Sequence, residues 1–103
     1  MSGAGAGDKG SAASVLVRQV TVRNRRGLHA RAAAKFVTLA ERFSAAVEVV
    51  KDGQAVSARS IMGLMMLGAG PGSVIELHAD GMDAREAMDG LVALVEAGFH
   101  EQD

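Results

Sequence analysis

The sequence predicts an α/β (α+β) fold, an open-faced two-layer sandwich in which helices cover one face of a single sheet. Two observations predict this class. Segments of strand and helix character follow one another in the order β-α-β-β-α-β-α, within 103 residues that fit one domain. The strand segments alternate apolar and polar side chains, so one face of the sheet should be buried and the other hydrated.

The first two elements are a strand and a helix. Residues 15–22, VLVRQVTV, are rich in β-branched side chains and place alternate apolar residues on one face, which is typical of a strand. A helix is expected from about residue 30 to about residue 42, where apolar residues recur at the helical period. The stripe that they form consists of Ala33, Phe36, Val37 and Ala40.

The middle of the chain predicts a β-hairpin. Residues 46–50, AVEVV, alternate again, and a return strand is expected over about residues 55–58. Between them lies Asp52-Gly53, a dipeptide that favours the tight two-residue turn of a hairpin. We therefore expect two neighbouring strands joined by this turn.

A short helix is expected after the hairpin. Ser60 is a suitable N-cap for a helix through SIMGLMML, residues 60–67. The segment GAGPG, residues 68–72, should end this helix because its glycines and proline break regular structure. The composition of GAGPG is similar to that of phosphate-binding loops. No Lys-Ser/Thr pair follows it, however, so we interpret it as a connecting loop.

The last two elements are a strand and the clearest helix. Residues 73–79, SVIELHA, alternate like the earlier strands. The helix is expected over residues 82–98, with a continuous apolar stripe and Gly98 as its stop. Asp83 followed by Glu86 has the spacing of a capping box, which predicts a local side-chain cap at its start.

The domain is expected to cover residues 14–99. A Gly/Ala/Ser-rich leader over residues 1–13 is expected to be disordered, and residues 100–103 should form a flexible tail. The leader lacks the apolar core of a secretory signal, and no apolar run approaches the ~18 residues of a membrane span. The chain has no cysteine, which excludes disulfides and thiolate metal sites. These features favour a cytoplasmic protein that does not contact a membrane.

Charge is unevenly distributed, although the net charge is only −1. From Glu76 to the end, eight acidic residues accompany a single arginine, Arg85. A basic patch marks residues 23–35 and suits a phosphate group or an acidic protein surface, with a solvated basic face as an equal alternative. Nucleic acid is less favoured, because the chain has no Tyr or Trp on which bases could stack. The basic patch consists of Arg23, Arg25, Arg26, Arg31 and Lys35.

The segment NRRGLHARAAAKFV, residues 24–37, places a histidine where the first helix begins. With His29 as N-cap, the first N–H groups of the helix have no partner within it and favour an anion beside the ring. The same positive end disfavours a proton on the imidazole, which keeps a nitrogen available as a nucleophile. Arg31 adds a guanidinium suited to a phosphoryl group, and Gly27 permits the turn that presents the ring.

These residues together predict a phosphoryl acceptor, with a surface cap residue without chemistry as the alternative. A metal site is not favoured, because His78 and His100 lack ligand spacing with His29 and are expected to lie on the surface. A serine hydrolase is not favoured either, because the chain has no G-x-S-x-G turn. We therefore expect neither a metal nor a cofactor.

Two segments resemble the signatures of the HPr family, the histidine-containing phosphocarriers of the phosphoenolpyruvate-dependent phosphotransferase system. NRRGLHARAAAKFV resembles the active-site stretch. SARSIMGLMMLGAGPGSVIEL, residues 57–77, resembles the second signature, a serine at the start of a short helix. The resemblance covers about Ser14 to Gly98. Asn24 and the C-terminal ALVEAGF lean toward the nitrogen-related branch of the family.

The resemblance implies a phosphoryl relay. His29 would accept a phosphoryl group on Nδ1 from enzyme I, with phosphoenolpyruvate as original donor, and pass it to a histidine of an enzyme IIA-type protein. Arg31 would stabilise the phosphoryl group, and Ser60 would be the regulatory site of HPr kinase/phosphorylase. The protein would be a carrier and co-substrate, not an enzyme. The family fold implies a four-stranded antiparallel sheet, ordered first-fourth-second-third, with three helices on one face.

A docking surface and a monomeric state are also expected. Exposed methionines of the short helix would adapt to different partners, although methionine at helical spacing is equally often core. The expected docking residues are Arg26, Leu28, Ala30, Ala34, Ile61, Met62 and Met65. Two rival functions are a regulatory binding protein that uses this surface without transfer and a basic module that binds nucleic acid.

One position departs from the family pattern. Ala32 stands where the family usually carries a proline after the arginine. At the third helical position a proline removes no hydrogen bond of the helix, so the chemistry is expected to survive the change. What the alanine gives up is stiffness at the helix start.

Overall fold

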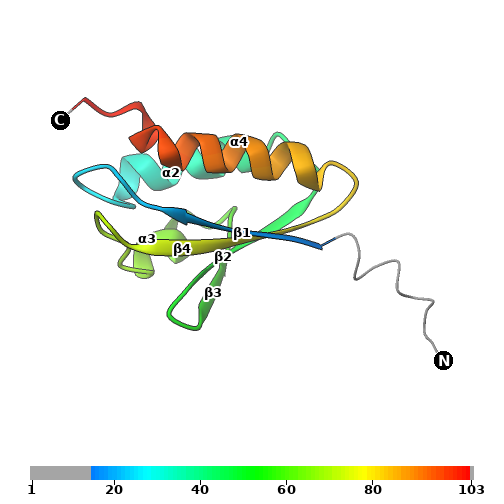
Figure 1. Ribbon diagram of the computed structural model, residues 1–103, viewed down its shortest axis with the longest axis horizontal. Helices are drawn as coiled ribbons and strands as arrows, with labels where there is room; N and C mark the ends of the chain where they lie inside the picture. Colours follow the sequence, from blue (N-terminus) through cyan, green and yellow to red (C-terminus); the bar gives the residue numbers. More distant parts are fainter. Residues whose placement is uncertain (1–14, 103) are drawn as a thin grey trace.

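The computed structural model describes residues 15–102, which form an open-faced sandwich of one sheet and overlying helices (Figure 1). The predicted fold class and element order are confirmed. The leader predicted over residues 1–13 lies outside the described residues. In chain order the elements are β1 (Val15–Thr21), α2 (Ala30–Ala40), β2 (Ala46–Lys51), β3 (Gln54–Ser57), α3 (Ile61–Met66), β4 (Val74–Asp80), α4 (Ala84–Glu96) and the 3-10 helix η2 (Gly98–His100).

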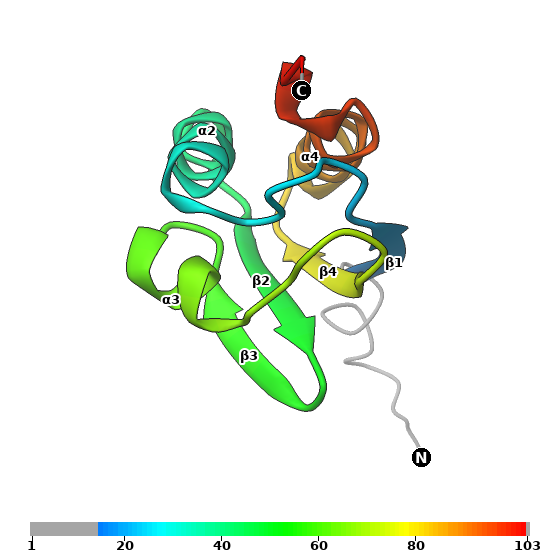
Figure 2. The same cartoon turned by 90° about the vertical axis from the view of Figure 1, so that its left-hand side faces the viewer.

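The sheet has the strand order β1-β4-β2-β3, and all neighbouring strands are antiparallel. This is the order that the resemblance implies. The last strand, β4, lies between the first strand and the hairpin, so it joins β1 to the hairpin in one sheet (Figure 2). The hairpin turn is the predicted Asp52-Gly53, where both residues adopt positive φ (50° and 79°), as a type I′ turn requires.

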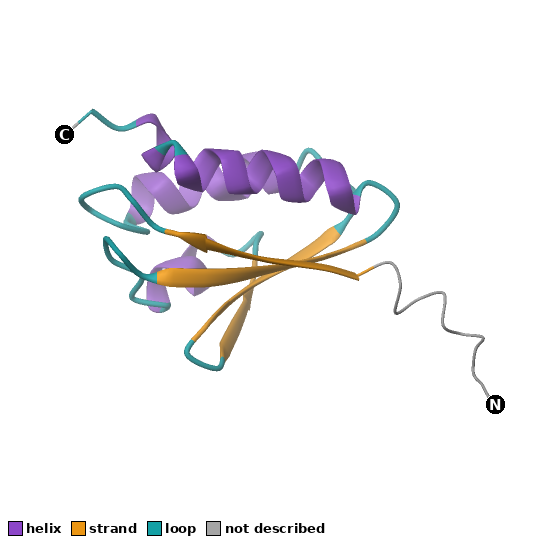
Figure 3. Ribbon diagram, in the orientation of Figure 1, coloured by secondary structure: helices purple, strands orange, loops and turns teal. Residues whose placement is uncertain are grey.

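Helices α2 and α4 lie side by side on one face of the sheet, and the opposite face is open (Figure 3). The short α3 packs against α2 and β3. Ile75 and Leu77 of β4 point into the core and are 1% and 0% exposed, whereas Val17 and Val74 on the open face are 51% and 52% exposed. The sheet therefore has the predicted buried and hydrated faces. Within residues 15–102, no helix has the length and apolar character to cross a membrane.

The start of α4 differs from the predicted capping box. Asp83 is the N-cap residue, but its side chain makes no hydrogen bond to its own helix. Its carboxylate instead accepts hydrogen bonds from the backbone N–H groups of Ser44 (2.9 Å) and Ala45 (2.8 Å). The bond from Ser44, with the help of Ala45 and against the effect of burial, lowers the pKa of Asp83 below its ordinary value. A tertiary contact thus replaces the local one.

The C-terminal segment also differs from the prediction. Gly98 ends α4 as expected, with a φ of 62°, and the side chain of Phe99 is fully buried. Glu101 belongs to the segment 100–103 that the sequence assigns to a flexible tail, yet its side chain is only 9% exposed. The tail prediction is wrong for Glu101, because its carboxylate finds hydrogen-bond partners near the start of the domain.

Two loops meet beneath the start of α2. Gly27 has a φ of 64°, and the N–H of Leu28 donates to the carbonyl oxygen of Ala69 at 2.9 Å. A Cβ on Gly27 would lie 2.2 Å from that same oxygen, so only glycine permits this approach. Leu28, predicted as a docking residue, is 5% exposed and packs mainly in the core, so its side chain offers little surface to a partner. The loop after α3 therefore holds the segment that leads into His29.

Replacing Asp83 with asparagine should destabilise the domain at neutral pH, because it weakens the tie between α4 and the loop after α2. The pKa of Asp83 in the folded state lies below its ordinary 3.8, so its stabilising effect is complete above that value and is lost as the pH falls through the folded-state pKa. We expect the melting temperature of Asp83→Asn to lie below that of the wild type at neutral pH and to approach it in strong acid.

Thermal unfolding followed by circular dichroism at both pH values measures this effect. Glu41→Gln removes the same charge from an exposed side chain and serves as the control. A deficit of Asp83→Asn that stays constant with pH would contradict the assignment.

Gly27→Ala should lower the free energy of unfolding by more than about 2 kcal/mol. Left-handed backbone costs a non-glycine residue roughly 1–2 kcal/mol, and the clash with Ala69 adds to that cost. Urea denaturation measures the difference. Gly70→Ala is the matched control in the facing loop, since no atom lies within 4 Å of a Cβ added there. Two equally stable variants would rule out the close approach.

Candidate functional site

His29 is the N-cap residue of α2, where the sequence predicts it. Its backbone is extended (φ −73°, ψ 176°), and its carbonyl oxygen accepts a helical hydrogen bond from the N–H of Ala33 at 2.9 Å. Its side chain makes no capping hydrogen bond, so it leaves the first N–H groups of the helix to another acceptor. Arg31 and Ala32 follow as the second and third helical residues.

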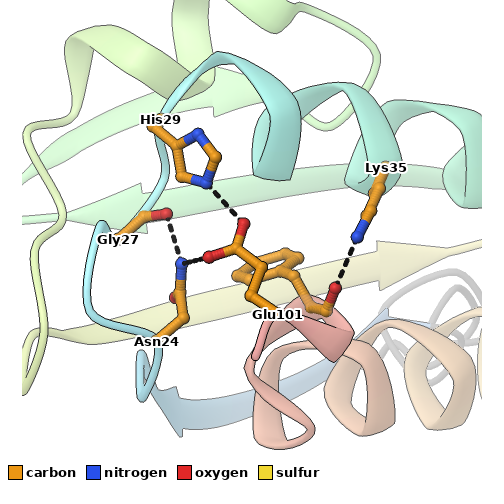
Figure 4. A network of polar contacts seen from close by, with 6 residues as sticks. Asn24, Gly27, His29, Lys35 and Glu101 are labelled. Atoms are coloured by element: carbon orange, nitrogen blue, oxygen red, sulfur yellow. Dashed lines mark hydrogen bonds and ion pairs between the residues drawn. The ribbon is translucent and has the colours of Figure 1, made fainter. Parts of the chain in front are cut away.

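A carboxylate from the far end of the chain contacts the ring of His29. Nε2 of His29 lies 2.5 Å from Oε2 of Glu101, and the two side chains are 18% and 9% exposed. The other carboxylate oxygen accepts a hydrogen bond from Nδ2 of Asn24 at 3.0 Å. Asn24 also donates to the carbonyl oxygen of Gly27 at 2.8 Å (Figure 4). The two ends of the domain therefore meet at the ring.

Glu101 is an ionised acceptor in this network. Burial alone would raise the pKa of Glu101, but hydrogen bonds from Asn24 and His29, and attraction to His29 and Lys35, lower the pKa below its ordinary value. Sequence reasoning missed this residue because 72 positions separate it from His29. The only signal in the sequence for this contact is the opposite charge of the basic patch and of the acidic C-terminal end, which attract each other.

The cations of the basic patch fall into two groups. Lys35 is tied to the fold, since its Nζ donates to the carbonyl oxygen of Phe99 at 2.7 Å. The arginines are exposed, and none of them forms an ion pair with another described residue. Their charge is therefore available to a phosphate or to an acidic surface. These arginines are Arg23, Arg25, Arg26 and Arg31.

The second predicted site lies at the start of α3. Ser60 is the N-cap residue, and its Oγ accepts a hydrogen bond from the N–H of Gly63 at 2.9 Å. Large apolar side chains of this helix are exposed to solvent, including Met66, which the sequence prediction leaves out. They are Ile61 (40%), Met62 (69%), Met65 (40%) and Met66 (70%).

The start of α2 and the end of α3 border one open depression. It has a volume of about 290 Å³, and its lining includes Arg26, His29 and Met65 together with the loop after α3. A cation, an imidazole and a methionine from separate motifs therefore surround one hollow. On the neighbouring surface of α2, Ala30 is exposed and Ala34 is half-buried.

The other two histidines do not line this depression. His78 on β4 faces the open side of the sheet, and its Nε2 lies 2.7 Å from Oε1 of Glu76. His100 ends η2 and is exposed. In the part of the chain that the structure describes, no group of three or more His, Cys, Asp or Glu side chains could hold a metal ion.

Known proteins resemble this chain over most of its length. A family model described as PTS HPr component phosphorylation site matches residues 16–97. The phosphocarrier protein HPr of Cupriavidus necator is 49% identical over 87 residues, which cover 84% of this chain and 98% of that protein. The phosphocarrier protein NPr of Shewanella violacea is 48% identical over 86 residues, which cover 84% and 94%. Because these identities are nearly equal, the nitrogen-related branch stays a prediction.

A solved structure shares the fold as well as the sequence. The crystal structure of HPr-C-His from Thermoanaerobacter tengcongensis superimposes with a TM-score of 0.81 at 44% identity, covering 85% of this chain and 99% of that one. The match therefore extends beyond the motifs around His29 and Ser60 to the whole sandwich. The chain belongs to the HPr family, the phosphocarrier proteins of the phosphotransferase system.

Proposed function

We propose that this chain carries a phosphoryl group on Nδ1 of His29, which it receives from phosphorylated enzyme I and passes to a histidine of an enzyme IIA-type protein. Phosphoenolpyruvate is the original donor. The observation that carries the proposal is the ring of His29 at the start of α2, beside N–H groups that its side chain leaves uncapped. The chain then acts in the cytoplasm as a monomeric co-substrate of the relay.

The proposed transfer is a displacement at phosphorus. The lone pair of Nδ1 forms the new N–P bond, while the bond from phosphorus to the donor nitrogen breaks and its electron pair stays with the donor. The first N–H groups of α2 and the guanidinium of Arg31 hold the phosphoryl oxygens. Arg31 is exposed, so water weakens its hold and the group remains free to leave.

Partners dock on the surface around the depression. Exposed arginines attract acidic surfaces and speed their approach, and flexible methionines adapt to different partners. We propose enzyme I, the enzyme IIA-type protein and HPr kinase/phosphorylase as these partners. The docking residues are Arg26, Ala30, Ala34, Ile61, Met62 and Met65, without the buried Leu28.

Ser60 is the proposed regulatory site. Its hydroxyl caps α3 next to the exposed methionines, so a phosphate there would stand beside the docking surface. A phosphoserine adds about −1.5 to −2 charge. At a helix start this charge is locally favourable, so the fold should persist. Its effect falls on acidic partners, which it repels.

Incubation with phosphoenolpyruvate and enzyme I should add one acid-labile phosphoryl group to the wild type, measured by intact mass spectrometry. His29→Ala should add none, because the nucleophile is gone. His78→Ala is the matched control and should take up phosphate normally, since His78 lies on the open face of the sheet. A wild type that stays unmodified would refute the carrier function and leave the binding protein as the alternative.

Ser60→Asp should slow phosphoryl transfer from enzyme I about fivefold at low salt, because a unit charge near an opposite charge is worth about 1 kcal/mol in water. The effect should shrink at high salt, where charges are screened. Ser60→Asn keeps a capping side chain without the charge and is the control. Equal rates for both variants, measured by rapid quench, would show that charge at this position does not regulate docking.

A further inference from the structure

A left-handed turn of the backbone returns the chain from α4 to His29. Gly98, Phe99 and His100 have consecutive φ values of 62°, 57° and 60°. Glycine adopts this region freely, but Phe99 and His100 do so at an energetic cost. Burial of the Phe99 side chain and the hydrogen bond from Lys35 to its carbonyl oxygen hold the turn in place. The core of the domain therefore fixes the path that brings Glu101 to the ring.

The contacts of Glu101 define which nitrogen of His29 carries a proton. Asn24 is 6% exposed, and its amide Nδ2 faces both the carbonyl oxygen of Gly27 and Oε1 of Glu101, so Oε2 is left to His29. An ionised carboxylate only accepts hydrogen bonds, so Nε2 must be the donor. In the neutral ring the lone pair then lies on Nδ1. Within residues 15–102, Nδ1 forms no hydrogen bond, and it points away from Glu101 (Figure 4).

We infer that Glu101 is a positioning residue for the phosphoryl acceptor, which holds His29 with its proton on Nε2 and stabilises the positive ring that forms when Nδ1 takes the phosphoryl group. The inference rests on the function proposed above for His29. Because the carboxylate approaches Nε2, it leaves the phosphoryl position at Nδ1 unobstructed.

The step balances without a proton leaving His29. Nδ1 supplies the electron pair of the new N–P bond, and the donor keeps the pair of the bond that breaks. The ring then holds the Nε2 proton and a positive charge, which the carboxylate 2.5 Å away stabilises by a charge-assisted hydrogen bond. Transfer to the next histidine reverses these changes, so the same contact serves both directions. Without the carboxylate, a share of the neutral rings would carry their proton on Nδ1 and could not attack.

A purely structural role for Glu101 makes a different prediction. If the side chain only fastened the C-terminal segment, glutamine would serve nearly as well, because its amide oxygen accepts from Asn24 and its length is the same. With that oxygen on Asn24, however, the amide NH2 group of glutamine faces Nε2 and can only donate to it, which favours the tautomer with its proton on Nδ1. The state of the ring therefore separates the two roles.

The first measurement is ¹⁵N NMR of the full chain with labelled histidine, at a pH where the ring is neutral. We expect the wild type to hold its proton on Nε2 and Glu101→Gln to shift the proton toward Nδ1. Glu96→Gln removes the same charge from an exposed position on α4 and should match the wild type. One tautomer ratio in all three proteins would overturn the inference. This readout needs no phosphoryl donor.

The second measurement is the rate of phosphorylation by enzyme I and phosphoenolpyruvate. Glu101→Gln should react about tenfold more slowly than the wild type and Glu96→Gln, as loss of a hydrogen bond to a charged group predicts. Equal rates would overturn the role in transfer while leaving the carrier function intact. A wild type that shows the tautomer preference but never gains phosphate would instead refute the carrier function.

Discussion

The site depends on the close approach of the backbone at Gly27 to the carbonyl oxygen of Ala69. The chain leaves β1 at the edge of the sheet and must begin α2 above its covered face. Gly27 makes that turn in a left-handed conformation, and Leu28 is drawn into the core directly after it. The next residue, His29, is then directed outward at the first turn of the helix. Core packing of Leu28 and the backbone contact at Ala69 therefore place His29, and the contact with Glu101 orients its ring.

This arrangement suits a group that must be held only briefly. The N–H groups at the start of α2 are fixed by the helix, so binding an anion there requires little reorganisation. Arg31 stands in solvent, where its attraction to a phosphoryl group is weakened by water. A deep pocket would bind the group more strongly and slow its departure. In the proposed function, Met65 in the depression beside His29 and the other exposed methionines of α3 would let partner proteins complete the site.

Local patterns in the sequence predicted the strands, the helices, the Asp52-Gly53 turn and the position of His29, because each depends on residues a few places apart. Asp83 and Glu101 were wrongly assigned for the opposite reason. Their partners lie 38 and 72 residues away, and no periodicity reports such contacts. The left-handed backbone of Phe99 could not be predicted from the sequence either. An aromatic residue adopts this conformation only when packing in the core compensates its energetic cost.

The uneven distribution of charge along the chain corresponds to two separate roles in the structure. One acid from the acidic end, Glu101, is nearly buried and interacts with Lys35 of the basic patch, whereas the arginines of that patch are exposed. The nearly buried carboxylate of Glu101 therefore acts on the ring of His29. The exposed arginines attract phosphate groups or acidic surfaces that approach from solvent. A partner that covers the depression excludes water, and in the lower dielectric the contact between Glu101 and His29 becomes stronger. Under the proposed function, the cationic ring would be stabilised most strongly while a donor or acceptor is docked, which is when the phosphoryl group has to move.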